Sequence, residues 1–138
     1  MKRTYSASLL ITVFTLCLEM ESCKKDEAPL NPIVGKWKLT GYSQNGVDVY
    51  RNINTCITDN TATFTSDLKL IFDEGPTKCN PSDPQAITET YSFNSDNTQL
   101  TVSGTSSSEI YKIQILNSTT LKLELTTLGD IITYTKIP

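Results

Sequence analysis

Histidine is absent from the 138 residues of this chain. The Ser–His and Cys–His pairs that activate common nucleophiles therefore cannot form. The sequence also lacks a glycine-rich phosphate loop, and the adjacent acids Asp73 and Glu74 would point to opposite faces of a strand. Two cysteines remote from the N-terminus cannot fill a tetrahedral zinc shell without histidine. We therefore expect a protein that is not an enzyme and carries no cofactor or metal.

Two further binding classes are disfavoured. The formal net charge is −3 and no dense basic stripe is present, which argues against nucleic-acid binding. Asp59, Asn60, Asn80 and Asp83 could offer oxygen atoms to calcium, but their spacing matches no recognised calcium loop. We expect neither nucleic acid nor calcium as a ligand.

The N-terminus has the three parts of an export signal. Lys2 and Arg3 come first, an apolar run over 7–18 follows, and the small residue Ser22 precedes Cys23. The run is too short for a membrane-spanning helix, which needs about 20 residues. We predict a lipoprotein signal peptide over 1–22 and an acyl anchor, such as palmitate, on Cys23. A buried first helix is the alternative.

The remaining cysteines have different expected fates. Cys17 would leave with the signal peptide, which leaves Cys56 and Cys79 in the exported chain. An even pair in an oxidising compartment suggests a disulfide, and closing such a loop is worth about 3 kcal/mol. Two free buried thiols are the alternative.

The exported chain divides into a tether over 23–32 and one domain over 33–138. The tether is charged and has no apolar period, whereas helical periodicity is nearly absent from the domain and short alternating strands dominate it. Asn45-Gly46 is a strong hairpin signal, and three prolines make 74–85 a long loop without regular pairing. The expected strands are 35–42, 47–50, 61–65, 68–73, 88–93, 99–103, 108–116, 121–125 and 131–137.

The alternation also predicts which side chains share a face. Tyr111, Ile113 and Ile115 should lie on one side of their strand, and alternate leucines from Leu121 to Leu125 give the clearest period of two. Tight turns join antiparallel neighbours. About eight such strands can close into a barrel that has no free edge, with a two-sheet sandwich as the rival fold.

Several segments carry a family resemblance. The Gly-x-Trp opening of 33–39 resembles the first strand of lipocalins. The chain as a whole resembles the lipocalin-like domains common in lipoproteins of the Bacteroidota. The matching pieces are 45–48, Cys56, 63–64, 74–85, 91–96, 100–102 and 134–136.

The resemblance covers 33–138 and implies an eight-stranded, antiparallel, up-and-down barrel. It also implies that Trp37 packs at the closed base, where Gly35 allows a close approach. The segment Lys24–Glu27 resembles signals that send such lipoproteins to the cell surface, so we expect a lipid anchor in the outer membrane with the domain facing outward.

Two functions follow from this fold. The first is binding of a small apolar ligand inside the barrel, because eight strands leave room for side chains or one small ligand. The second is a filled barrel whose 74–85 loop contacts an envelope protein. The candidate ligand-lining residues are Tyr91, Phe93, Leu100, Val102, Tyr111, Ile113, Leu121 and Leu123. An open interior cavity would favour the first function and a packed interior the second.

Overall fold

The computed structural model describes residues 31–138. The predicted signal peptide, Cys23 and all but the last two residues of the tether lie outside the described residues. No helix within 31–138 is long and apolar enough to cross a membrane. The strands are β1 (Gly35–Gln44), β2 (Val47–Asp48), β3 (Thr61–Phe64), β4 (Lys69–Asp73), β5 (Ala86–Phe93), β6 (Gln99–Ser103), β7 (Ser108–Leu116), β8 (Thr120–Leu125) and β9 (Ile131–Ile137).

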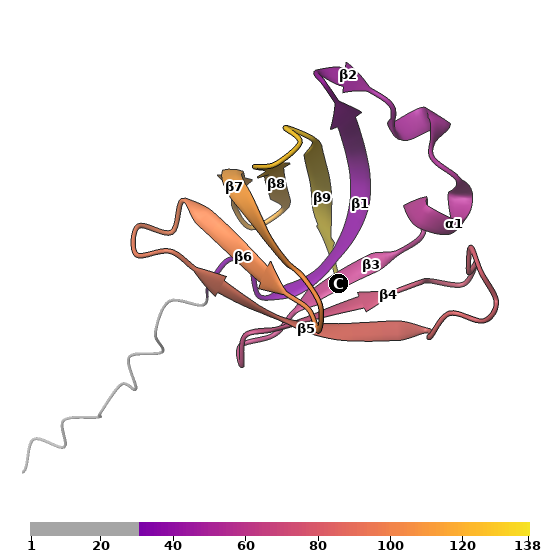
Figure 1. Cartoon of the computed structure of the whole chain (residues 1–138), viewed down its shortest axis with the longest axis horizontal. Helices are drawn as coiled ribbons and strands as arrows, with labels where there is room; N and C mark the ends of the chain where they lie inside the picture. The colour runs from indigo at the N-terminus through magenta and orange to yellow at the C-terminus, as the bar shows by residue number, and fades with distance from the viewer. Residues whose placement is uncertain (1–30) are drawn as a thin grey trace, which may run out of the picture.

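The strands form an antiparallel up-and-down barrel (Figure 1). Each strand from β3 to β8 pairs with the next along the chain, and β1 pairs with both β3 and β9. The β1–β9 pairing closes the cylinder over seven residue pairs, from Lys36–Ile137 to Ser43–Ile131. Strand β2 only extends the tip of β1, so eight strands make the wall. The predicted barrel is confirmed and the sandwich is excluded.

The segment after the predicted Asn45-Gly46 hairpin departs from the expected strand. The hairpin forms, but β2 ends at Asp48 because the Asp48 carboxylate accepts a hydrogen bond from the backbone N–H of Tyr50 (2.9 Å). This turn starts a short 3-10 helix, η1 (Tyr50–Asn52), and a one-turn helix follows, α1 (Thr55–Thr58). The Asn54 side chain caps α1 by accepting from the Cys56 N–H (3.3 Å).

A β-bulge in β7 corrects one predicted face. Ile113 lies opposite Leu123, but the next register pair is Ile115 with Lys122, so Gln114 is the extra residue. One extra residue reverses the alternation beyond it. Ile115 therefore lies on the exposed outer surface, and Leu116 takes the inward position opposite Leu121. The prediction that Ile115 shares a face with Tyr111 and Ile113 is wrong.

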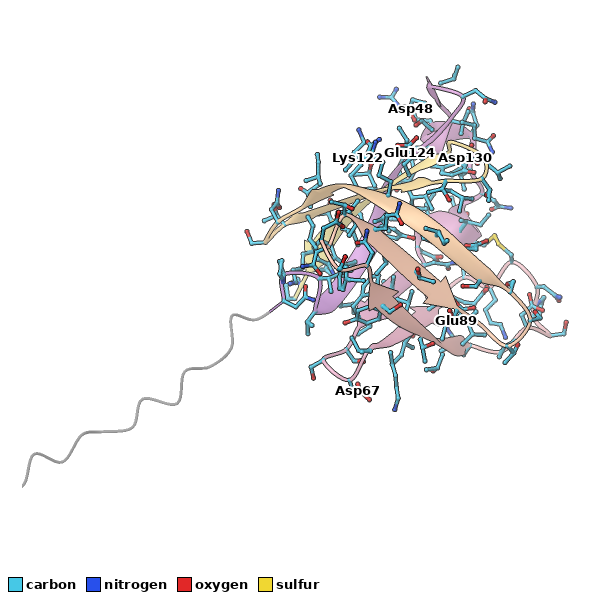
Figure 2. The ribbon with its side chains drawn as sticks, turned by 60° about the vertical axis from the view of Figure 1, so that its left-hand side comes forward. Asp48, Asp67, Glu89, Lys122, Glu124 and Asp130 are labelled. Atoms are coloured by element: carbon cyan, nitrogen blue, oxygen red, sulfur yellow. A yellow bond between two sulfur atoms is a disulfide. The ribbon has the colours of Figure 1, made fainter. Side chains whose placement is uncertain are left out.

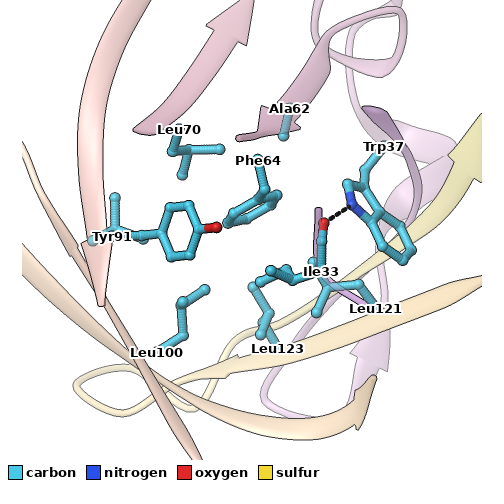
Figure 3. Packing of buried hydrophobic residues seen from close by; sticks show 10 residues of the cluster. Ile33, Trp37, Ala62, Phe64, Leu70, Tyr91, Leu100, Leu121 and Leu123 are labelled. Atoms are coloured by element: carbon cyan, nitrogen blue, oxygen red, sulfur yellow. Dashed lines mark hydrogen bonds between the residues drawn. The ribbon is translucent and has the colours of Figure 1, made fainter. Parts of the chain in front are cut away.

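The base of the barrel is closed by Trp37 and its neighbours (Figure 3). Trp37 has no exposed surface, and its indole N–H donates to the Ile33 carbonyl oxygen (2.7 Å). The Lys136 ammonium lies 5.0 Å from the Trp37 ring centre and donates to the Pro32 carbonyl oxygen (3.0 Å). A Cβ on Gly35 would come within 2.5 Å of the Lys136 side chain. Gly35 thus leaves the space that Lys136 occupies.

The two ends of the barrel differ in their connections. Short turns at 65–68, 94–98 and 117–119 join the strands at the base, where the described chain also begins and ends. The two long connections, 45–60 and 74–85, lie at the opposite end, which we call the mouth (Figure 1). The turns 104–107 and 126–130 join strands at this end too. Long connections at one end place the irregular, functionally variable part of the chain there.

Candidate functional site at the mouth of the barrel

The eight predicted ligand-lining residues all contribute to the core of the barrel. Five are buried, and Phe93, Tyr111 and Ile113 are partly buried against them. The Tyr91 ring packs edge-on against Phe64, with ring centres 5.1 Å apart, and against Phe93 at 6.0 Å. The buried five are Tyr91, Leu100, Val102, Leu121 and Leu123.

These side chains fill most of the space that they enclose. The cavity among them has a volume of about 20 Å³ and is bordered by Leu100, Tyr111 and Leu123 among others. That is close to the least volume that one water molecule needs. By the criterion stated above, this packed interior counts against a ligand held among the eight residues. Their ligand-lining role stays a prediction, and the space for a larger ligand lies elsewhere.

A larger apolar pocket lies at the mouth and has a volume of about 360 Å³. One wall belongs to the barrel, and the other comes from the connection between β2 and β3. Ile132 and Tyr134 border this pocket and also the small interior cavity, so the pocket continues the barrel interior outward. The lining residues are Leu39, Tyr42, Ile53, Ile57, Ile132 and Tyr134.

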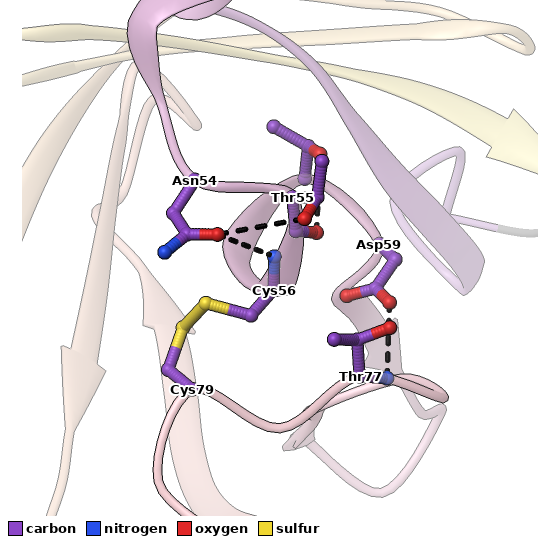
Figure 4. Close-up of a disulfide and its surroundings, with 7 residues drawn as sticks. Asn54, Thr55, Cys56, Asp59, Thr77 and Cys79 are labelled. Carbon is purple, nitrogen blue, oxygen red and sulfur yellow. Dashed lines mark hydrogen bonds between the residues drawn. A yellow bond between two sulfur atoms is a disulfide. The ribbon is translucent and has the colours of Figure 1, made fainter.

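The outer wall of this mouth pocket is held by hydrogen bonds and by a disulfide (Figure 4). The Tyr50 hydroxyl donates to the Leu39 carbonyl oxygen (3.0 Å) and ties η1 to β1. Cys56, next to Ile57, is bonded to Cys79, which confirms the predicted pairing. The Asp59 carboxylate also accepts from the Thr77 N–H (3.0 Å). The connection between β2 and β3 is thus joined to the 74–85 loop as well as to the strands at its two ends.

The 74–85 loop has an ordered internal structure. The Gln85 amide donates to the Asp73 carboxylate (3.0 Å) and to the Gly75 carbonyl oxygen (2.9 Å). The Lys78 ammonium donates to the carbonyl oxygens of Pro81 and Asp83. These bonds fix the loop shape without regular pairing. Contact of this loop with a partner protein stays a prediction.

Two of the four residues considered for calcium, Asn60 and Asp83, border one pocket between the β2–β3 connection and the 74–85 loop. Asn80 and Asp83 hydrogen bond to each other (3.0 Å) within the loop, whereas Asp59 is engaged with Thr77. Over residues 31–138, no group of three or more His, Cys, Asp or Glu side chains is arranged to hold a metal ion. The groups that the mouth offers are apolar side chains, hydroxyls and carboxylates.

Three carboxylates at the mouth were missed by the sequence analysis. Glu89 and Glu109 border a cavity of about 170 Å³ that Tyr111 shares. Asp130 is only 7% exposed and accepts hydrogen bonds from the Tyr42 hydroxyl (2.6 Å) and the Gln44 amide (3.3 Å). Each acid lies two residues before an inward-facing side chain, so the period-two pattern could have found all three.

The tyrosine hydroxyls at the mouth are held in the neutral form. Burial raises the pKa of Tyr111, and its hydrogen bond to Glu109 raises it further. Burial, with a smaller effect from the Glu109 charge, raises the pKa of Tyr134 to about 12. The hydrogen bond to Asp130 is the main cause of a raised pKa at Tyr42. These groups remain hydrogen-bond donors at neutral pH.

Comparison with known proteins agrees with this architecture. A crystal structure of a DUF4847 family protein from Bacteroides vulgatus has a similar fold, with a TM-score of 0.54 and 14% sequence identity. The superposition covers 75% of this chain and 92% of that one. No curated protein matches the sequence significantly. Residues 33–123 match the family described as "Lipocalin-like domain", and the chain belongs to this family.

Proposed function

We propose that this protein binds one small, largely apolar ligand in the mouth pocket and is held to the outer membrane by lipid on Cys23. The mouth pocket carries the proposal. Its volume of about 360 Å³ lies within the range of about 300–1,000 Å³ typical of small-molecule sites. Four aliphatic side chains supply apolar contacts, and the hydroxyls of Tyr42 and Tyr134 can orient a polar group.

The position of the pocket suits the barrel fold. Ligands of small closed barrels enter at the open end, where the strand connections are long. In this chain the lower interior is filled and the base is sealed by Trp37 and Lys136. A ligand would therefore sit high in the barrel, between the β1–β9 wall and the segment that carries Ile53 and Ile57. We propose this binding role rather than a catalytic one.

The proposed anchor gives the binding site an orientation. The described chain begins with Asn31 and Pro32 at the base, where the Pro32 carbonyl oxygen accepts from Lys136. A tether that runs from Cys23 to this point would bring the base toward the membrane. The mouth would then face away from the bilayer, open to ligands in the surrounding medium. Lys24–Glu27 supports an outward-facing location at the cell surface.

A neutral fluorescent probe tests the ligand site. N-phenyl-1-naphthylamine becomes bright when it leaves water for an apolar pocket, and we expect saturable binding at one site. Ile57→Asp should abolish most of the signal, because a carboxylate in the pocket wall would have to lose its water when the probe enters. The measurement is a fluorescence titration of residues 23–138, produced without the lipid.

A matched variant separates site binding from adhesion to the surface. Ile115 is 42% exposed, as is Ile57, but it lies on the outer face of β7. Ile115→Asp should leave the titration unchanged. Absence of saturable binding in the wild-type domain would refute the proposed function, and an equal loss in both variants would refute the assignment to the mouth pocket.

A further inference from the structure

The charges around the mouth pocket restrict the chemistry of its ligand. We infer that the ligand is an amphipathic organic cation, with an apolar body in the mouth pocket and an ammonium-type group near Glu89, Glu109 and Asp130. This inference rests on the proposed function, because it assigns a ligand class to the same site.

The strand register places two of these acids on the inner face of the barrel. Glu89 pairs with Leu70, and Glu109 pairs with Val102. Directly paired residues project to the same face of a sheet, and both Leu70 and Val102 are buried in the core. The glutamates therefore point inward, one position closer to the mouth than Tyr91 and Tyr111 in the alternating pattern.

Glu89 is also fitted closely into the mouth. A Cβ built on Gly104 would come within 2.6 Å of the Glu89 carboxylate. The absence of a side chain at Gly104 thus lets Glu89 lie against the 104–107 turn. Glu109 accepts a hydrogen bond from the Tyr111 hydroxyl. Both carboxylates border the same cavity of about 170 Å³.

Asp130 supplies the third negative charge, and it lies in the 126–130 turn between β8 and β9. It lies two residues before inward-facing Ile132, and Tyr42, a lining residue of the mouth pocket, donates to it. Figure 2 shows Asp130 near Asp48, at the tip of the β1–β2 hairpin, and far from Asp67. Asp67 belongs to the 65–68 turn at the base. Asp130 thus bonds to a lining residue of the mouth pocket, whereas Glu89 and Glu109 border the neighbouring acidic cavity of the mouth.

No cation in the described chain neutralises these three acids. Within residues 31–138 the structure contains one ion pair, Lys69–Asp67, at the base. The inward-facing Lys136 is also at the base, over Trp37. In the described mouth loops, Lys78 is bound to loop carbonyl oxygens and Arg51 is exposed to solvent. A ligand that supplies positive charge would complete this arrangement.

Tyr111 and Tyr134 connect the apolar and acidic parts. Tyr134 borders the mouth pocket and the small interior cavity, and Tyr111 borders that cavity and the acidic one. Because the small cavity between these rings is filled, a ligand seated against Leu39, Ile57 and Ile132 would keep its charged end at the mouth and would not pass through the interior. Aromatic faces attract cations, so Tyr42 and Tyr134 in the mouth pocket also favour an ammonium group.

Three probes with the same alkyl chain test the charge preference. Octan-1-amine is a cation at pH 7, octan-1-ol is neutral and octanoate is an anion. Each is used below its aggregation concentration to displace N-phenyl-1-naphthylamine from the domain. We expect octan-1-amine to bind about tenfold more tightly than octanoate, with octan-1-ol between them. Higher salt should reduce the difference, because partly exposed charges are screened.

Charge-neutral variants assign the preference to the named residues. Glu89→Gln with Glu109→Gln removes two charges and keeps an acceptor for the Tyr111 hydroxyl, so octan-1-amine affinity should fall toward that of octan-1-ol. The control is Glu124→Gln, because Glu124 pairs with Lys112 on the outer face of β8 and accepts from Gln114 there. This control should keep the full preference for the amine.

The outcomes distinguish the two proposals. If none of the three probes displaces the fluorophore and the fluorophore itself does not bind, the ligand-binding function fails. If octan-1-ol binds in the mouth pocket but octan-1-amine binds no better than octanoate, ligand binding stands and the cation inference is overturned. An amine preference that survives in the double glutamate variant would overturn the assignment to these carboxylates.

Discussion

Tyr134 borders both the mouth pocket and the small interior cavity. Burial and, to a smaller extent, the Glu109 charge oppose ionisation of its hydroxyl. The effect of its ionisation on stability can be measured in the free protein, without knowledge of the ligand.

Alkaline pH should destabilise the domain through this residue. The pKa of Tyr134 is raised from 10.0 to about 12 in the folded protein, so between these values the folded state holds a proton that the unfolded state has lost. Stability is therefore unaffected below pH 10 and falls as pH rises toward 12. The loss is on the order of 2 kcal/mol, at about 1.4 kcal/mol per pKa unit.

Urea unfolding at pH 9, 10 and 11 measures this effect, with Trp37 fluorescence as the signal because it is the single tryptophan. Tyr134→Phe removes the ionisable group and keeps the ring, so its stability should decline less steeply over the same pH range. Parallel declines in the two proteins would contradict the role assigned to Tyr134.

At the scale of one element, the segment that contains η1 and α1 forms part of the mouth, and strand pairing does not hold it in place. The Cys56–Cys79 disulfide joins it to the 74–85 loop across a sequence separation of 23 residues. Ile57 lies beside this link and lines the mouth pocket. The pocket wall thus depends on a covalent bond as well as on packing.

Removal of the disulfide should affect both stability and binding. We expect Cys56→Ala with Cys79→Ala to lose about 3 kcal/mol of unfolding free energy, the usual value for closing a loop of this size. Binding of N-phenyl-1-naphthylamine should weaken as well, because Ile57 is no longer held over the pocket. Urea unfolding and fluorescence titration measure the two effects.

Reduction of the wild-type protein provides the control for that variant. Treated with dithiothreitol, the wild-type domain should bind the probe as weakly as the double alanine variant, whereas the reductant should not change the variant. If the reduced wild-type domain bound the probe with undiminished affinity, the disulfide would have no part in shaping the site.

Several strand boundaries were predicted correctly from the sequence. The bounds of β6, β7 and β9 were predicted as the structure has them, because period-two alternation and turn residues act locally. The β7 bulge at Gln114 was not predicted. It is decided by the pairing with β8, which puts Ile113 opposite Leu123 and Leu116 opposite Leu121. No pattern within 108–116 contains that information.

At the scale of the whole molecule, the barrel separates a sealed base from an open mouth. Both ends of the described chain lie at the base, and the proposed ligand site lies at the other end. An anchor at Cys23 would therefore leave the site clear of the bilayer. The anchor is a proposal that fractionation of the native cells can test.

If the proposed signal peptide over 1–22 is removed on export, Cys23→Ala should release the protein from the membrane fraction, because no acyl chain would hold it there. Immunoblots of membrane and soluble fractions measure the change. Cys17→Ala, within the signal, should keep the protein in the membrane fraction. Membrane association of Cys23→Ala equal to that of the wild type would refute the lipid anchor.

The sequence by itself determined the local features: the strands, the hairpin at Asn45-Gly46, the irregular 74–85 loop and the inward faces of most strands. These follow from side-chain alternation and turn chemistry, which involve neighbouring residues only. Closure through β1 and β9, the filled lower interior and the mouth pocket were decided by the tertiary structure. The space left in a barrel depends on how side chains from eight strands interdigitate. The pocket itself joins Leu39, Ile57 and Tyr134, which no local pattern connects.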